Sequence, residues 1–154
     1  MTNGKGSLKM TARGFTLLEL IIVIVIMGAM AGLAFPRIGD AVTQQSVRSA
    51  RAGMISFVAK ARGTAIQRGS TVRLIVSSNR VFVQAAHPVT NALQTVGVME
   101  DFNARWGVTV DPTNDTLVYD ARGIGLEASE TVYTVSRGAF ASRIVISVVG
   151  RVIQ

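Results

Sequence analysis

The sequence predicts an α+β protein in which a long N-terminal helix packs on antiparallel β-sheet. Three observations carry this prediction. An apolar segment, Phe15–Phe35, has Glu19 as its only charge. A stripe of apolar residues recurs at helical spacing within Asp40–Gln67, and apolar and polar residues alternate at period two after Gly69. The chain has 154 residues, a length that allows one domain of ordinary size.

The first 35 residues are typical of a membrane segment that follows a basic leader. Met1–Gly14 contains three bases and no acid. As a helix, Phe15–Phe35 would span about 31 Å, which matches a hydrocarbon core of about 30 Å. The positive-inside rule then places Met1–Gly14 in the cytoplasm and everything after Pro36 across the membrane, as a single pass.

Glu19 is the unusual residue of this segment. A carboxylate near the start of a membrane helix costs a few kcal/mol on insertion scales, and it usually marks a functional site. One alternative is that Glu19 lies shallow enough to reach the headgroups. A second alternative is an ordinary secretory signal peptide cut after Ala29-Met30-Ala31, although the apolar segment exceeds the roughly 7–15 residues typical of such peptides.

The run Gly14-Phe15-Thr16-Leu17-Leu18-Glu19 resembles the cleavage and methylation motif of type IV prepilins. The resemblance implies that a membrane prepilin peptidase cuts after Gly14 and methylates the new N-terminus, Phe15. It implies that Glu19 pairs with the terminal amine of a neighbouring subunit in the filament, and that the region of Pro36 bends or melts on assembly. The chain would then comprise a leader at 1–14, a transmembrane helix at 15–38 and a displayed domain at 39–154.

Elementary chemistry supports the role of Glu19. Cleavage converts the nitrogen of Phe15 from a neutral amide into an amine with a reference pKa of about 7.7–8.0, which is mostly cationic. Methylation keeps this charge, so processing creates the partner that a carboxylate in the membrane lacks. Pro36 removes a backbone donor and predicts a local kink or loosening of the helix.

Beyond the membrane segment we expect a second stretch of helix and then strands. Helical character should return at Asp40 and last to about Gln67. Its apolar stripe should cover a sheet and consists of Val47, Ala50, Met54, Phe57, Ala61 and Ala65. The expected strands include a hairpin around Ser78-Asn79-Arg80 and a polar loop from His87 to Gln94. They are Thr71–Ser77, Val81–Ala85, Thr95–Met99, Trp106–Val110, Leu117–Tyr119, Thr131–Val135, Arg143–Val148 and Arg151–Ile153.

A second resemblance concerns this domain. The passage Ser49–Leu74 is similar to the helix-to-first-strand region of the minor pilins that include the H-type (GspH) pseudopilin of type II secretion and the FimT type. The endings Leu117–Gly123 and Arg143–Val152 also fit, although the C-terminal cysteine pair of many type IV pilins is missing. The resemblance implies a minor pilin or pseudopilin in the bacterial inner membrane, with a periplasmic domain. It would join a type II secretion pseudopilus or a type IV pilus. The implied partners are prepilin peptidase, other pilin subunits, the inner membrane, and a secreted substrate or DNA.

Positive charge is unevenly distributed. Ala41–Met99 contains seven bases and no acid, and Arg48, Arg51 and Arg62 fall within about 60° of one another on a helix. Such a stripe can bind the phosphates of DNA. The favoured alternatives are a solvated face, or contact with acidic surfaces of neighbouring subunits.

Composition leaves little room for catalysis. The chain has no cysteine and one histidine, His87, which excludes thiolate zinc sites, cysteine nucleophiles and sites with two imidazoles. Asp111, Asp115 and Asp120 are close enough in sequence to suggest Ca²⁺, but their spacing is not that of an EF-hand, and aspartates also favour turns. We therefore expect no enzyme, no catalytic residue, no cofactor and no metal.

Overall fold

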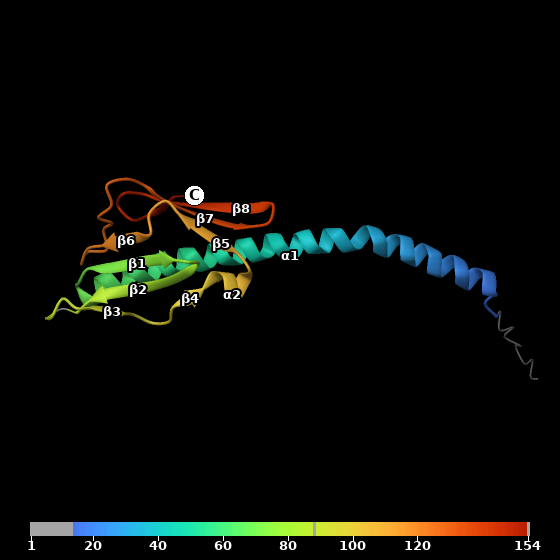
Figure 1. Ribbon diagram of the computed structural model, residues 1–154, viewed down its shortest axis with the longest axis horizontal. Coiled ribbons are helices and arrows are strands. Elements are labelled where there is room, and N and C mark those ends of the chain that lie inside the picture. Colours follow the sequence, from blue (N-terminus) through green and yellow to red (C-terminus); the bar gives the residue numbers. More distant parts are fainter. Residues whose placement is uncertain (1–13, 88, 154) are drawn as a thin grey trace, which may run out of the picture. The chain divides into compact units, whose positions relative to one another are not determined.

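The computed structural model describes residues 14–87 and 89–153, without the side chains of residues 33–37. Of the expected leader, only Gly14 lies within this description. The chain divides into two compact units, with the boundary between Gly39 and Asp40. One helix, α1 (Leu17–Arg68), belongs to both units (Figure 1).

The backbone of α1 is helical through Pro36. The sequence predicts that helical character returns at Asp40 after the membrane segment, and this detail is wrong, because one helix runs without interruption from Leu17 to Arg68. A proline removes one backbone donor, and the turns on either side keep their hydrogen bonds. Among the described residues, no helix combines the length and the apolar character needed to cross a membrane.

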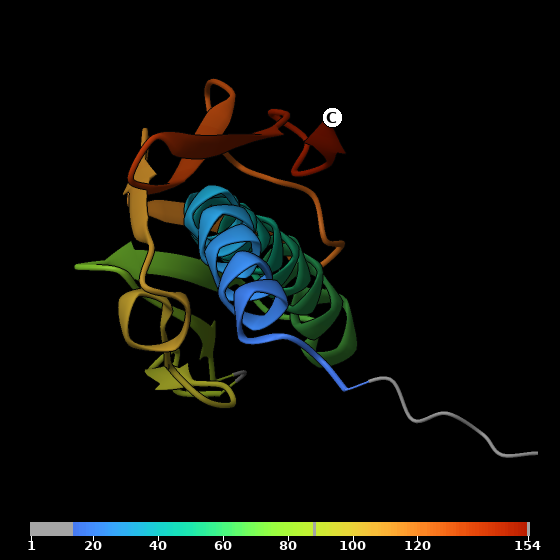
Figure 2. The same ribbon diagram turned by 90° about the vertical axis from the view of Figure 1, so that its right-hand side faces the viewer.

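The second unit contains two antiparallel sheets. The first has the order β3 (Leu93–Thr95), β2 (Arg80–Ala86), β1 (Val72–Ser77), β6 (Thr116–Tyr119), and β4 (Glu100–Asp101) pairs with the opposite end of β2. The second has the order β5 (Thr109–Pro112), β7 (Thr131–Arg137), β8 (Phe140–Ile146), β9 (Val152–Ile153). A short helix, α2 (Phe102–Trp106), connects β4 to β5. In Figure 2, which looks along α1, the strands curve around more than one side of the helix.

The core of this unit lies between α1 and the sheets. All six residues of the predicted apolar stripe, Val47 to Ala65, are buried, which confirms that prediction. They meet the inward side chains of both sheets, among which Tyr119 and Tyr133 are fully buried. The described core runs from Val47 to Ile146 and so lies entirely within the second unit. The predicted α+β fold, with a long helix packed on antiparallel sheet, is confirmed.

Two predicted details of the strands are wrong. Thr95–Met99 is not one strand, because pairing with β2 places strands at Leu93–Thr95 and Glu100–Asp101 instead. Trp106 ends α2 rather than starting a strand. The period-two pattern Trp106-x-Val108-x-Val110 is typical of a strand, but α2 ends within it. Gly107 caps that helix in the left-handed conformation with φ 64°.

Candidate processing and assembly site

The residues before α1 form a capped helix start. Gly14, Phe15 and Thr16 are not helical, and α1 begins at Leu17. The backbone N–H of Glu19 donates to Oγ1 of Thr16 at 3.2 Å, and the N–H of Leu20 donates to the carbonyl of Thr16 at 3.3 Å. Thr16 is therefore the N-cap, with a glutamate three residues later, as in a capping box. The sequence contains this signal in Thr16-Leu-Leu-Glu19, but sequence reasoning assigned no role to Thr16.

The bond expected to be cut lies in open surroundings. The side chain of Phe15 is 79% exposed. A Cβ placed on Gly14 would have no atom within 4 Å, apart from its chain neighbours. Cleavage of a peptide bond requires accessible backbone that is free of regular structure. The structure supplies both at Gly14–Phe15.

The first turn of α1 carries an exposed acidic side chain. Glu19 lies in the first turn of α1 and is exposed. Its carboxylate lies at the N-terminal end of the helix, where the helix dipole is positive and interacts favourably with negative charge. If the chain began at Phe15, its terminal amine would lie two residues before Leu17, where this turn begins. Each subunit would then present one cation and one anion at the same end of the helix.

The first unit also presents an apolar surface. Large apolar side chains from Leu17 to Met30 are each 46–79% exposed, so they lie on every side of α1. A helix that is apolar all round must be covered by other chains or by lipid. The described part of the first unit therefore offers an apolar surface that a partner could cover.

The three predicted arginines lie on one flank of the helix in the second unit. Arg48 and Arg62 are exposed and Arg51 is half-buried. Among the described residues none of the three forms an ion pair, whereas other arginines bind carboxylates. Those pairs are Arg80–Asp101 at 3.7 Å, Arg122–Asp120 at 2.9 Å, and Arg105–Glu100.

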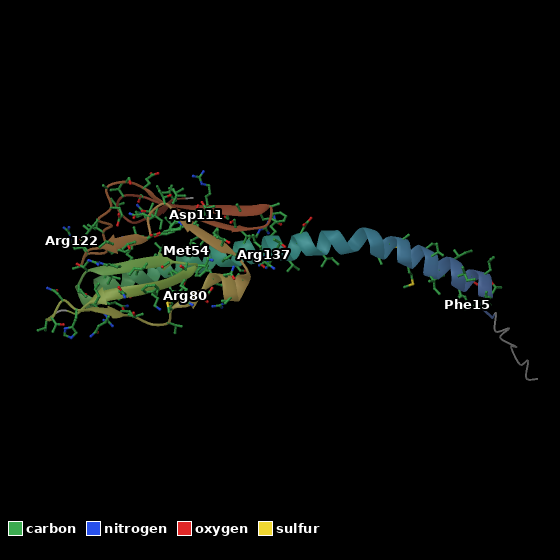
Figure 3. The ribbon with its side chains drawn as sticks, in the orientation of Figure 1. Phe15, Met54, Arg80, Asp111, Arg122 and Arg137 are labelled. Carbon is green, nitrogen blue, oxygen red and sulfur yellow. The ribbon has the colours of Figure 1, made fainter. Side chains whose placement is uncertain are left out.

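Arg137 is a further engaged cation that sequence reasoning missed. Its guanidinium donates to Oγ of Ser46 and to the carbonyl of Trp106, both at 2.9 Å. Figure 3 shows Arg137 beside α1 and α2, and Arg122 at the opposite end of this unit. Nothing in the sequence indicates these contacts, because Ser46 lies 91 positions away.

Of the three aspartates considered for Ca²⁺, Asp120 binds groups of its own turn. The carboxylate of Asp120 accepts from the N–H groups of Ile124 at 2.8 Å and Arg122 at 2.9 Å. The N–H of Ile124, followed by the side chain of Arg122, lowers the pKa of Asp120. Asp120 thus closes a turn, as the second interpretation of these residues predicts. In the described part of the chain, no three His, Cys, Asp or Glu residues gather in a way that could hold a metal ion.

Comparison with known proteins decides the family. The model of the prokaryotic N-terminal methylation motif matches residues 9–35, and the model of the type II transport protein GspH matches residues 50–150, more than half of the chain. The chain belongs to the GspH family of minor pilins and pseudopilins.

Relatives of this GspH-family protein agree with the assignment. It is 30% identical to the pilin-like protein PilA1 of Thermus thermophilus, over 92% of this chain and 97% of PilA1. Its fold is similar to two crystal forms of the type IV minor pilin FimU of Pseudomonas aeruginosa. The TM-scores are 0.57 and 0.53 at 13% identity, covering 71% and 69% of this chain and 87% and 90% of FimU. At that identity the likeness concerns the fold. Family and fold are those of structural filament subunits rather than enzymes.

Proposed function

We propose that this protein is a minor subunit of a pilin-like filament, made as an inner-membrane precursor. Prepilin peptidase cuts after Gly14 and methylates Phe15. The helix Phe15–Phe35 leaves the membrane to pack in the core of the filament, and the domain after residue 38 is displayed on its surface or tip. The observation that carries the proposal is the capped helix start, with an exposed cleavage bond followed by Glu19.

Glu19 sets the register of the subunit in this mechanism. A carboxylate buried among apolar helices is costly unless it is paired. Within the filament, the amine of Phe15 on a neighbouring subunit supplies the opposite charge. Pairing fails if the helix slides by one turn, so the ion pair selects one axial position.

Replacement of Glu19 by alanine tests the proposal. We expect E19A to be inserted and cut normally, because the cleavage bond keeps its surroundings. Incorporation into filaments should fall about tenfold or more, since an unpaired amine in an apolar core costs more than about 1.4 kcal/mol. Quantitative mass spectrometry of sheared filaments measures incorporation, with E130A, which changes an exposed acid in the domain, as the matched control. Normal incorporation of E19A would contradict the proposal.

The proposal covers both filament systems. The matching family model is named for type II transport, whereas PilA1 and FimU carry pilin names. In either system the same steps apply: cleavage, methylation, helix packing and display. An ordinary exported protein cut after Ala31 would take none of these steps, and its N-terminus would be Gly32.

DNA binding is a second candidate, because Arg48, Arg51 and Arg62 form no ion pair among the described residues. If they bind phosphates, the affinity of the isolated domain for a DNA duplex should fall steeply with salt. It should fall further when the three are changed to glutamine. Undetectable binding at low salt would remove this candidate.

A further inference from the structure

A groove runs along α1 in the second unit, opposite the flank that faces α2. Its cavity volume is about 360 Å³. One wall is the helix surface with Ala59, Arg62, Gly63 and Ile66, and the other is the turn that leads into β9, with Gly150 and Arg151. We call this site the α1–β9 groove.

The wall opposite the helix is held in place by close contacts. The hydroxyl of Tyr119 donates to the carbonyl of Gly150 at 2.9 Å, and the N–H of Gly125 donates to the carbonyl of Val149 at 3.1 Å. Gly150 has φ 80°, and a Cβ placed there would lie 2.3 Å from a ring carbon of Tyr119. These contacts join the two sheets and hold the turn in place beside α1. The groove therefore exists before any ligand binds.

An exposed apolar patch borders the groove. Ile66 contacts the loop at Gly123, where a Cβ would lie 2.8 Å from its side chain. Gly125, between Ile124 and Leu126, contacts the backbone of Val148 and Gly150. The patch consists of the exposed residues Ile66, Ile124, Leu126, Val148 and Val149. Large apolar side chains gathered in this way on a surface mark an interaction site.

The charge of the groove is uncompensated. Arg62 and Arg151 line it without any acid, and neither forms an ion pair in the described part of the chain. The groove on the other flank of α1 differs, because Glu100 there pairs with Arg105. A ligand of the α1–β9 groove must therefore bring both apolar surface and negative charge.

We propose that the α1–β9 groove binds an extended segment of another filament subunit, in which aliphatic side chains are flanked by carboxylates. The small residues of the helix wall, Ala59 and Gly63, leave space for the backbone of the segment, and the two arginines select its carboxylates. A protein segment fits better than DNA, because the lining is largely aliphatic and offers no aromatic ring for a base. The nature of the partner rests on the proposed function, whereas the chemistry of the groove does not.

Fluorescence anisotropy on the fragment Asp40–Gln154, which contains the whole described core, tests the proposal. The probes are a labelled nonapeptide in which leucine alternates with glutamate, the same peptide with lysine for glutamate, and a labelled DNA duplex. We expect the glutamate peptide to bind and the lysine peptide to bind at least about tenfold more weakly. R62Q and R151Q should each weaken binding about threefold.

Two further variants separate a groove from general attraction to a basic domain. G63L should abolish binding without harming the fold, because a Cβ at Gly63 meets nothing within 4 Å and leucine favours a helix. R73Q, which removes an exposed charge from β1, should bind as the unchanged domain does. Equal binding of both peptides, full binding by G63L, no binding of the glutamate peptide, or binding of the duplex alone would overturn the proposal. Cleavage at Gly14, measured separately by mass, reports on the proposed function and does not depend on these results.

Discussion

Gly150 and Gly138 both have positive φ, but they differ in the space available for a side chain. Gly150 combines φ 80° with the contact to Tyr119, whereas Gly138, in the β7–β8 turn, has φ 57° and open space around its Cα. The left-handed conformation alone costs a non-glycine residue about 1–2 kcal/mol. A steric clash in a packed site adds roughly 1–3 kcal/mol. Of these two glycines, only Gly150 should therefore be destabilised further by a clash with the Tyr119 ring.

We expect G150A to lower the free energy of unfolding by about 2–5 kcal/mol, and G138A to lower it by about 1–2 kcal/mol. Urea unfolding of the fragment Asp40–Gln154, followed by circular dichroism, measures both. Y119A in the G150A background removes the ring that the new methyl group would meet. If G150A and G138A were equally destabilised, the contact with Tyr119 would not restrict this position.

The buried tyrosines predict an alkaline limit to stability. Burial raises the pKa of Tyr119 to about 12, and burial also raises the pKa of Tyr133, so both are neutral in the folded domain at pH 10. In the unfolded chain they ionise near pH 10. The contribution of the two tyrosines to the free energy of unfolding is therefore complete below pH 10. It is lost as the pH rises from 10 to 12, at up to about 1.4 kcal/mol per pH unit for each tyrosine.

Urea unfolding at pH 9, 10 and 11, with absorbance at 295 nm to report tyrosinate, checks this limit. The chain contains two tyrosines, so the absorbance change belongs to this pair. We expect tyrosinate to appear together with unfolding rather than before it. Full ionisation of the folded domain at pH 10 would contradict the burial of both hydroxyls.

At the scale of elements, the sequence predicts the helices and strands that carry a regular spacing of apolar residues over a long continuous segment. The stripe on α1 and the β1–β2 hairpin are of this kind, since each repeats one spacing over several turns or residues. The misplaced elements are β3, β4 and α2, which contain two to five residues each. Such short elements depend on partners distant in sequence, here β2 and Asn79. Asp101 and Gly107, which cap α2, were the available local signal.

The candidate sites divide in the same way. Gly14–Glu19 is a contiguous motif, and reasoning from sequence identified it except for the cap at Thr16. The α1–β9 groove joins residues that lie about 85 positions apart along the chain, such as Ile66 and Arg151. No pattern within either segment indicates that these residues line one groove, which forms only when the sheets pack around α1.

Arg137 should stabilise the first turns of α1 in the second unit. Its guanidinium binds Ser46, whose hydroxyl donates to the carbonyl of Val42 at 3.0 Å. We expect R137Q to lower the free energy of local opening of this turn by about 1–2 kcal/mol, so that amide hydrogen exchange around Ser46 becomes about 5–30-fold faster. R73Q is the matched control, with no change expected there. Unchanged exchange in R137Q would mean that the helix turn does not depend on this arginine.

At the scale of the whole molecule, the two units have different requirements. The second unit contains the described core, from Val47 to Ile146, and can bury it without help. The described part of the first unit exposes apolar side chains on every side of α1 and needs other chains or lipid to cover them. This division suits the proposed function, in which the second unit would fold before the subunit joins a filament.

We therefore expect the fragment Asp40–Gln154 to fold alone. It should be monomeric and should unfold in one cooperative transition, because its core is complete. Analytical ultracentrifugation and thermal unfolding by circular dichroism measure both properties. A fragment that unfolds without a transition would show that residues before Asp40 are needed for the fold.

The mass and N-terminal residue of the protein purified from its native membrane test the central claim most directly. The proposed pathway predicts a chain that begins at Phe15 and carries one additional methyl group on its terminal amine. A chain that begins at Gly32, or one that keeps Met1–Gly14 in the filament, would contradict it.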